Sequence, residues 1–177
     1  MWGWTLASVV AIYATLGLAG RLATQLPAGL TSSLFGLGFL VALVTVGLSG
    51  WLFGSGRSEA WVRAGVAAVY GMILVRMGTE GAERTHLFEY GLVALLIHEA
   101  LAERRRGGRS VPYPPLTAVV VASLLGWLDE LLQGVVPGRV YDLRDVGFNA
   151  GAAAMAVAAS RALAWARSRD RGRAAPR

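Results

Sequence analysis

The chain has 177 residues, of which 55% are hydrophobic and 16% charged, and its mean hydropathy of +0.51 excludes an ordinary soluble domain. It has no cysteine, which excludes disulfides, thiolate metal sites and cysteine nucleophiles. Every basic residue is an arginine, so Schiff-base lysine chemistry is excluded as well. The net charge of +6 falls in short loops and in the tail, so it predicts membrane topology and not nucleic-acid binding.

Six apolar segments recur along the chain, each near the ~20 residues that an α-helix needs to cross the ~30 Å hydrocarbon layer. The sequence therefore predicts an all-α fold, a polytopic transmembrane bundle of about six helices. The first segment lacks a basic region before it and leads into further spans, so we interpret it as a transmembrane helix and not as a signal peptide. The segments are residues 2–20, 34–53, 60–75, 86–102, 116–132 and 145–163, and the third is the shortest.

The arginines are distributed unevenly between the two sides of this bundle. If both termini are cytoplasmic, the outer side receives few arginines, and most of these are balanced by acids. This asymmetry follows the positive-inside rule and predicts a multi-pass protein of the cell membrane with both termini in the cytoplasm. The inner set is Arg57, Arg63, Arg104, Arg105, Arg106, Arg109, Arg167, Arg169, Arg171, Arg173 and Arg177.

We divide the chain into N-terminal transmembrane helices in residues 1–59, a transmembrane core in residues 60–166 and a basic cytoplasmic tail in residues 167–177. The tail is polar, and we interpret it as a disordered topology anchor near anionic lipid headgroups. At the start of the sixth segment, Gly147 and Gly151 form a pair of small residues one turn apart, which is typical of tight helix packing.

Three polar groups meet on the outer side in this topology. One opens the fourth segment on a single helix face, one ends the fifth segment, and one opens the sixth. A short polar connection joins the fifth segment to the sixth. Together they predict a ligand-binding polar cluster formed by His86, Glu89, Tyr90, Asp129, Glu130, Gln133, Arg139, Asp142, Arg144, Asp145 and Asn149.

Asp129 and Glu130 carry most of this hypothesis. They lie about one turn inside the apolar end of a helix, where an unpaired carboxylate costs roughly 2.5–3.5 kcal/mol. We expect at least one of them to face a polar cavity and to pair with Arg139, Arg144 or His86.

Other members of the group also have simpler explanations. Asp145 has the position of an acid that stabilises a helix N-terminus. Arg139 and Arg144 are also compatible with solvated loop charges, and His86 with an interfacial side chain. At the inner end of the fourth segment, His98 and Glu99 are interpreted as interfacial and structural residues.

The ordered set of these motifs resembles the pattern of VanZ-like integral membrane proteins over about half of the chain, within the core of residues 60–166. The resemblance implies a bacterial cell-envelope protein, and the founding member of the family is associated with teicoplanin resistance. In many members an Asp-Lys pair precedes the histidine, where this chain has Glu83, Arg84 and Thr85. The motifs are His86-Leu87-Phe88-Glu89-Tyr90-Gly91-Leu92, Asp129-Glu130-x-x-Gln133, Pro137-Gly138-Arg139, Asp142, and Asp145 with Asn149 and Gly151.

Two functions from different classes follow. In the first, the cluster binds an anionic envelope molecule: a lipid-linked cell-wall precursor, a phospholipid headgroup or a peptide carboxylate. Arg139 and Arg144 supply charge-assisted hydrogen bonds, and the acids orient these arginines. This function names membrane lipids as partners and needs no cofactor.

In the second, the protein is a membrane-embedded enzyme acting on a lipid or cell-wall precursor. His86 or Glu130 then acts as a general base, and a metal ion is held by His86, Glu89 and Asp129. The first function has the stronger support, because a salt-bridge network also produces one imidazole among several acids. A third class, a purely structural partner of other membrane proteins, requires the outer residues to be silent when mutated.

Overall fold

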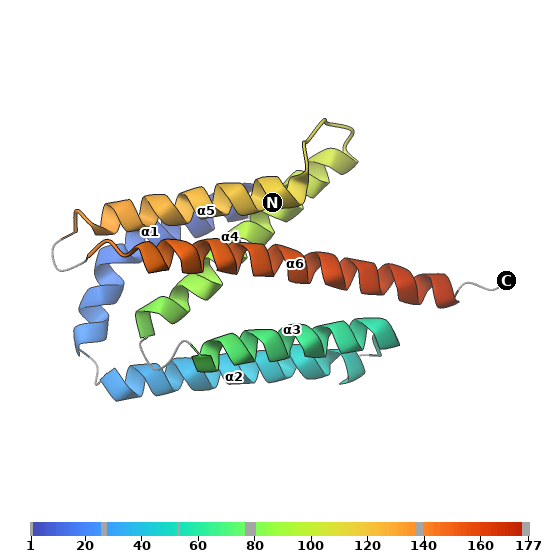
Figure 1. Ribbon diagram of the computed structural model, residues 1–177, viewed down its shortest axis with the longest axis horizontal. Helices are drawn as coiled ribbons and strands as arrows, with labels where there is room; N and C mark the ends of the chain where they lie inside the picture. Colours follow the sequence, from blue (N-terminus) through green and yellow to red (C-terminus); the bar gives the residue numbers. More distant parts are fainter. Residues whose placement is uncertain (1, 26–27, 53, 77–80, 137–139, 175–177) are drawn as a thin grey trace. The chain divides into compact units, whose positions relative to one another are not determined.

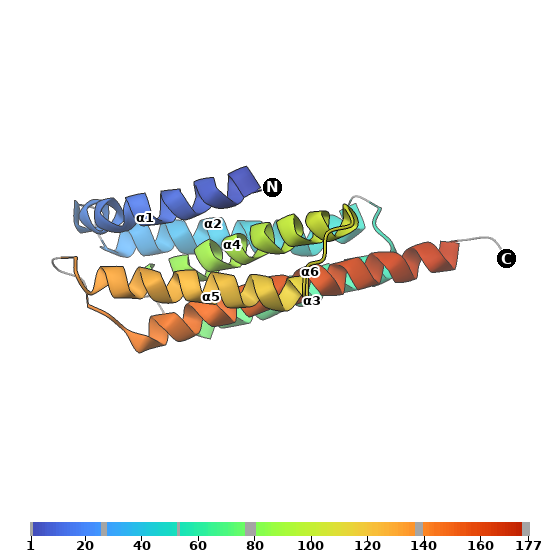
Figure 2. The same ribbon diagram turned by 90° about the horizontal axis from the view of Figure 1, so that it is seen from above.

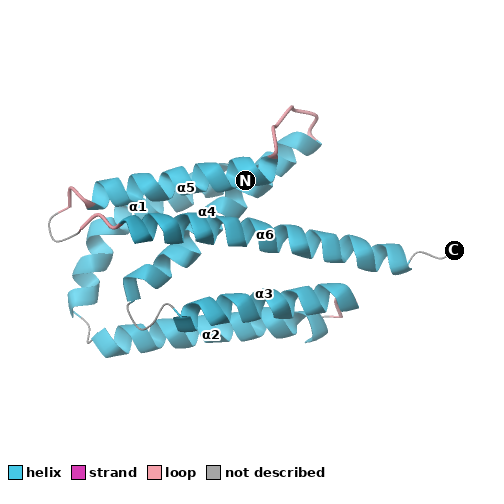
Figure 3. Cartoon of the chain, viewed as in Figure 1, coloured by secondary structure: helices cyan, strands magenta, loops and turns pink. Residues whose placement is uncertain are grey.

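The computed structural model describes residues 2–25, 28–52, 54–76, 81–136 and 140–174. Within these residues every regular element is an α-helix, and there are six (Figures 1 and 3). The prediction of an all-α bundle of about six helices is confirmed. The helices are α1 Trp2–Gln25, α2 Ala28–Leu52, α3 Arg57–Arg76, α4 Gly81–Arg106, α5 Pro114–Gln133 and α6 Leu143–Ala174.

The helices are longer than most of the apolar segments because polar residues extend their ends. α4 continues through three consecutive arginines, which are good helix formers and stabilise the last turn through the helix dipole. α6 likewise continues through the basic tail to Ala174, so the expectation of a disordered tail is wrong for residues 167–174. At the start of α5, Pro114 and Pro115 occupy the first helical positions, where a missing N–H costs little.

Several of these helices match the dimensions of a membrane span. Three stretches within the described residues are long and apolar enough to cross a membrane: Arg57–Val75, Pro114–Gln133 and Leu143–Arg173. Shorter apolar helical stretches cover Trp2–Ala14 and Gly36–Leu52. The third apolar segment, the shortest in the sequence, thus belongs to a full-length candidate span. These lengths and compositions indicate a membrane protein.

The chain folds into two compact units, and α6 contributes to both. The first unit consists of Met1–Pro27 and Ala82–Val157, which includes α1, nearly all of α4, α5 and the first half of α6. In this unit α5 lies beside the first half of α6, as both views show (Figures 1 and 2). Because a short connection joins them, the two helices run antiparallel.

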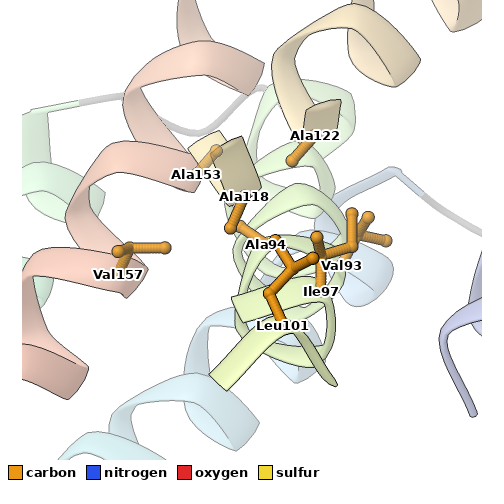
Figure 4. Packing of buried hydrophobic residues seen from close by; sticks show 8 residues of the cluster. All are labelled: Val93, Ala94, Ile97, Leu101, Ala118, Ala122, Ala153 and Val157. Carbon is orange, nitrogen blue, oxygen red and sulfur yellow. The ribbon is translucent and has the colours of Figure 1, made fainter. Parts of the chain in front are cut away.

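The core of the first unit is formed by mostly large residues on α4 and mostly alanines on α5 and α6. Alanines on the last two helices allow the backbones to approach closely, and branched side chains of α4 fill the remaining space. The cluster contains Val93, Ala94, Ile97 and Leu101 of α4, Ala118 and Ala122 of α5, and Ala153 and Val157 of α6 (Figure 4).

The close-packing glycine of this unit is not in the predicted pair. A Cβ added to Gly147 or Gly151 would meet no heavy atom within 4 Å outside its own helical turns, so neither glycine mediates packing within the described chain. Gly126 of α5 does, because a Cβ there would lie 2.6 Å from Cβ of Asn149. Ala152 and Ala153, which continue the predicted small surface, are buried.

The second unit consists of Ala28–Gly81 and Ala158–Arg177, which includes α2, α3 and the second half of α6. α2 and α3 form an antiparallel hairpin whose turn contains Gly54 at φ 67°, a conformation that favours glycine. A Cβ on Gly50 would lie 2.5 Å from Cα of Ala60, so the helices touch backbone to backbone at this point. Trp51 and Trp61 meet edge to face beside the turn, with their ring centroids 5.6 Å apart.

Candidate functional site

Asp129 and Glu130 lie on the buried face of α5, one turn from its end. They are 1% and 0% exposed, and Gln133, one turn further on, is 3% exposed. Nε2 of Gln133 donates to Oδ2 of Asp129 at 3.3 Å and to Oε1 of Glu130 at 3.0 Å. A single neutral amide therefore bridges two adjacent buried carboxyl groups.

Asn149 of α6 contacts the same face of α5. Its side chain is fully buried, and its Nδ2 donates to the backbone oxygen of Gly126 at 3.2 Å. That oxygen already belongs to the hydrogen-bonded backbone of α5, so it accepts a second hydrogen bond. The absence of a side chain at Gly126 gives the amide room to reach it.

Two tyrosines complete the cluster from α1 and α4. Tyr90 is 1% exposed, and its hydroxyl interacts electrostatically with the carboxylate of Asp129. Tyr13 of α1 also interacts with Asp129, and its hydroxyl donates to the backbone oxygen of Leu125 at 2.9 Å. We call Tyr13, Tyr90, Asp129, Glu130, Gln133 and Asn149 the polar cluster.

The connection from α5 to α6 is attached to this cluster by Glu130. The backbone N–H of Asp142 donates to Oε2 of Glu130 at 3.5 Å. Asp142 itself caps α6, because its Oδ1 accepts from the backbone N–H of Arg144 at 2.8 Å. The side chain of Arg144 is exposed, whereas Asp145 and Glu89 are half-buried.

The structure thus brings together six of the eleven predicted site residues: Tyr90, Asp129, Glu130, Gln133 and Asn149 in the cluster, with Asp142 tied to it. Tyr13, which sequence reasoning missed, joins them from the first apolar segment. No signal in that segment separates this tyrosine from an ordinary interfacial one. Two predicted residues, Arg139 and the side chain of His86, lie outside the described residues.

The ion pairing expected for Asp129 is not found within the described residues. Asp129 makes no ion pair with any side chain that the structure describes, and Arg144, one of its predicted partners, is exposed to solvent. Two buried oxygens, Oδ1 of Asp129 and Oδ1 of Asn149, accept no hydrogen bond within the same residues. In the described part of the chain, no group of three or more His, Asp or Glu side chains is arranged to hold a metal ion. The predicted metal set includes the imidazole of His86, which lies outside that part.

A second polar group, which the sequence analysis did not predict, lies in the second unit. Glu59, in the first turn of α3, accepts from Nη2 of Arg63 at 2.6 Å and from Nε of Arg167 at 2.9 Å. Nη1 of Arg63 also donates to Oγ of Ser49 at 2.6 Å. One buried acid is therefore held by two arginines, one from its own helix and one from α6.

Asp170 of α6 joins this group by capping α3. Its carboxylate accepts from the backbone N–H groups of Ser58 at 3.2 Å and Glu59 at 3.0 Å, which are unpaired donors at a helix start. We call Glu59, Arg63, Arg167 and Asp170 the arginine clamp. The signal in the sequence was Asp170, a single acid among the arginines of the tail. The positive-inside rule counts the arginines and gives little weight to an acid among them, so it did not reveal this contact.

The predicted structural role of His98 and Glu99 agrees with their contacts at the other end of α4. Nδ1 of His98 lies 3.9 Å from Oε1 of Glu99, and Nη2 of Arg106 lies 3.7 Å from Oε2 of the same carboxylate. Glu99 is half-exposed, so this ion pair is screened by solvent and contributes little to stability.

Comparison of the chain with models of protein families, with curated proteins and with solved structures finds no match. The fold and the site nevertheless define a class: a helical membrane protein with buried carboxyl groups in a cluster to which four helices contribute. Its function has to be inferred from the chemistry of that site.

Proposed function

We propose that the chain is a VanZ-like integral membrane protein of the bacterial cell envelope whose polar cluster supports the binding of an anionic envelope molecule. The ligand class comprises lipid-linked cell-wall precursors, phospholipid headgroups and peptide carboxylates. Both termini are cytoplasmic in this proposal, and the site faces outward. Through the family resemblance, the proposal extends to a role in glycopeptide resistance.

The observation that carries the proposal is the attachment of the α5–α6 connection to Glu130. This acid is fully buried, and its Oε2 accepts from the backbone of Asp142. The connection between them contains Arg139, and Arg144 follows one residue into α6. The buried acid therefore contacts the start of α6 close to two arginines in the sequence, and a guanidinium near this end of the helix favours binding of an anion at the membrane surface.

The start of α6 adds to this support. Helix N-termini present N–H groups and a partial positive charge, which favour anions. Asp142 satisfies the N–H of Arg144 and keeps the first turn of α6 in place. Because the guanidinium of Arg144 is exposed, an external phosphate or carboxylate can reach it without rearrangement of the helix.

The proposal distinguishes the two arginines. Arg139 belongs to the segment between Glu130 and the cap, and we propose that its planar guanidinium bridges a cluster acid and the external anion. Arg144 contacts the anion from the more exposed side. Arg139→Lys then loses bidentate geometry and lowers affinity about tenfold, whereas Arg144→Lys lowers it about twofold. Arg105→Lys, in the exposed basic end of α4, serves as the matched control.

The measurement uses the full chain in nanodiscs of phosphatidylcholine, titrated with undecaprenyl phosphate or with phosphatidylglycerol as two separate probes. The expected result is saturable binding of at least one probe, weakened in the order given for the lysine variants. Binding that Arg139→Lys leaves intact contradicts the bidentate role, and equal loss of binding and of thermal stability assigns Arg139 to a structural ion pair. A wild-type protein that binds neither probe contradicts the assignment of a lipid-linked precursor and that of a phospholipid headgroup.

A further inference from the structure

Two oxygen atoms of the polar cluster are buried and accept no hydrogen bond within the described residues: Oδ1 of Asp129 and Oδ1 of Asn149. The other polar atom of each side chain is engaged, because Oδ2 of Asp129 accepts from Gln133 and Nδ2 of Asn149 donates to Gly126. Buried acceptors in folded proteins nearly always meet a donor, an ordered water or a cation. Two orphaned acceptors in one cluster therefore indicate a missing positive or donating group.

The two oxygens belong to the same seam between α5 and α6. Gly126 meets Asn149 across this seam, and Asp129 lies one turn further along α5. Because α6 runs antiparallel to α5, that direction leads toward the start of α6. Helical side chains lean toward the N-terminus of their helix, so the amide of Asn149 extends toward the level of Asp129.

The charge of Asp129 decides what kind of group fits. Within the described residues the amide of Gln133 and the hydroxyls of Tyr90 and Tyr13 lie beside this carboxylate, and all three are neutral. The carboxyl group of Glu130, which shares the amide of Gln133, adds a second acid nearby. A bridging water satisfies the two oxygens but leaves the negative charge uncompensated in an apolar surrounding, where it is costly. A bound cation satisfies the oxygens and also compensates the charge.

We propose that Oδ1 of Asp129, Oδ1 of Asn149 and the hydroxyl oxygen of Tyr90 are ligands of a monovalent cation, and that this cation is Na⁺. Hard cations take oxygen ligands, and Ca²⁺ or Mg²⁺ sites are built mainly from carboxylates and water. One carboxylate with two neutral oxygens matches a single positive charge, and no metal-holding group of three acids or histidines occurs among the described residues. The cation site uses Asp129 and Asn149, whereas the proposed anion binding uses the arginines of the α5–α6 connection and the contact of Glu130 with that connection.

The test measures the thermal stability of the purified full chain in detergent while NaCl replaces choline chloride at constant ionic strength. A ligand that binds only the folded state raises Tm in a saturable way. We expect a rise of about 3–6 °C at Na⁺ tenfold above its Kd, with smaller or no rises for K⁺ and Li⁺. A wild-type protein with the same Tm in Na⁺, K⁺, Li⁺ and choline overturns the proposal and assigns the two oxygens to water.

Variants locate the site if the rise is seen. Asp129→Asn removes the charge with nearly the same shape and should abolish the Na⁺-dependent rise, and Tyr90→Phe should weaken apparent Na⁺ affinity severalfold. Glu99→Gln, a carboxylate on α4 outside the cluster, should keep the full rise. A rise retained in both Asp129→Asn and Tyr90→Phe overturns the assignment to this cluster. Equilibrium binding of radioactive Na⁺ to the wild-type protein decides the question even if Asp129→Asn fails to fold, since absence of binding also overturns it.

Discussion

The acids of the polar cluster and those of the arginine clamp differ in the groups that surround them. In the clamp, Glu59 is contacted by two guanidinium groups, and Asp170 accepts two backbone N–H groups at a helix start. The negative charges are thus compensated within the chain. This arrangement fixes the second half of α6 to the start of α3. Because these acids are already paired within the chain, the clamp has a structural role.

The polar cluster holds two carboxyl groups, and the described side chain that donates to Asp129 is a neutral amide. The amide of Gln133 donates to both, and the backbone of Asp142 donates to Glu130. Asp129 also keeps one buried oxygen without a partner among the described residues. The difference teaches that burial of an acid does not by itself mark a functional site. An acid that is buried and lacks a compensating charge does, because its cost must be offset by something the protein binds.

The largest expected effect concerns the topology, that is, the side of the membrane at which the polar cluster lies. The chain has no cysteine, so single cysteines can be introduced at two exposed positions on either side of α5, Arg109 and Val140. In intact cells an impermeant maleimide should label Val140→Cys and leave Arg109→Cys unlabelled, and both should react after permeabilisation. Labelling of Arg109→Cys alone places the cluster on the inner side and removes the basis for an outward-facing site.

The next effect concerns the packing that brings Asn149 to α5. Gly126→Ala places a methyl group 2.6 Å from Cβ of Asn149, so α5 and α6 must separate. We expect a loss of about 1–3 kcal/mol, measured as a lower Tm in detergent. Gly151→Ala is the matched control, because nothing lies within 4 Å of its methyl position. Alanine also favours the helix there, so this variant should be as stable as the wild type or slightly more stable.

The acids themselves provide the direct comparison between the two regions. Glu130→Gln should lose most of the binding proposed for the site while keeping Tm close to the wild-type value. Glutamine keeps the shape of the side chain and an oxygen that can still accept from Gln133 and from the backbone of Asp142, and it removes the negative charge. Glu59→Gln should leave ligand binding unchanged and lower the free energy of unfolding by about 1 kcal/mol. Stability falls because Arg63 and Arg167 lose the carboxylate with which both pair.

Glu99→Gln controls for the substitution itself, since this acid belongs to neither region. Binding in nanodiscs and Tm in detergent are measured for all three variants at matched expression. If Glu130→Gln and Glu59→Gln lose binding and stability in the same proportion, the distinction between a site and a clamp is wrong.

The fold and part of the site were predictable from the sequence because they rest on local signals. Apolar runs of membrane length predict the helices, and acids such as Asp129 and Glu130 inside such a run indicate a buried polar site. Their convergence with Tyr90 and Asn149 followed from the number of helices and the alternation of direction. Neither the positions of the helices nor the convergence of these residues requires knowledge of how closely the helices pack.

The remaining features depend on tertiary contacts that have no local signal. The contact of Tyr13 with the cluster requires that α1 pack against α4 and α5, which hydropathy cannot specify. Likewise, Asp170 caps a helix more than a hundred residues earlier in the chain. Gly126 and Gly147 look alike in sequence, and only the orientation of their helices decides which one allows a close approach.

The smallest expected effect concerns the cap of α6 and separates the side chain of Asp142 from its backbone. Oδ1 accepts from the backbone N–H of Arg144, and the backbone N–H of Asp142 donates to Glu130. Asp142→Ala removes the first interaction and keeps the second, so it should lower stability by about 1 kcal/mol, or about 2–4 °C in Tm. Asp142→Asn should remain near the wild-type Tm, because asparagine caps helices about as well as aspartate. Neither variant should affect anion binding strongly if the connection is held by the backbone contact to Glu130. A tenfold loss of binding in Asp142→Asn, with Tm retained, would show instead that the carboxylate of Asp142 acts within the binding site, as its place in the predicted cluster first indicated.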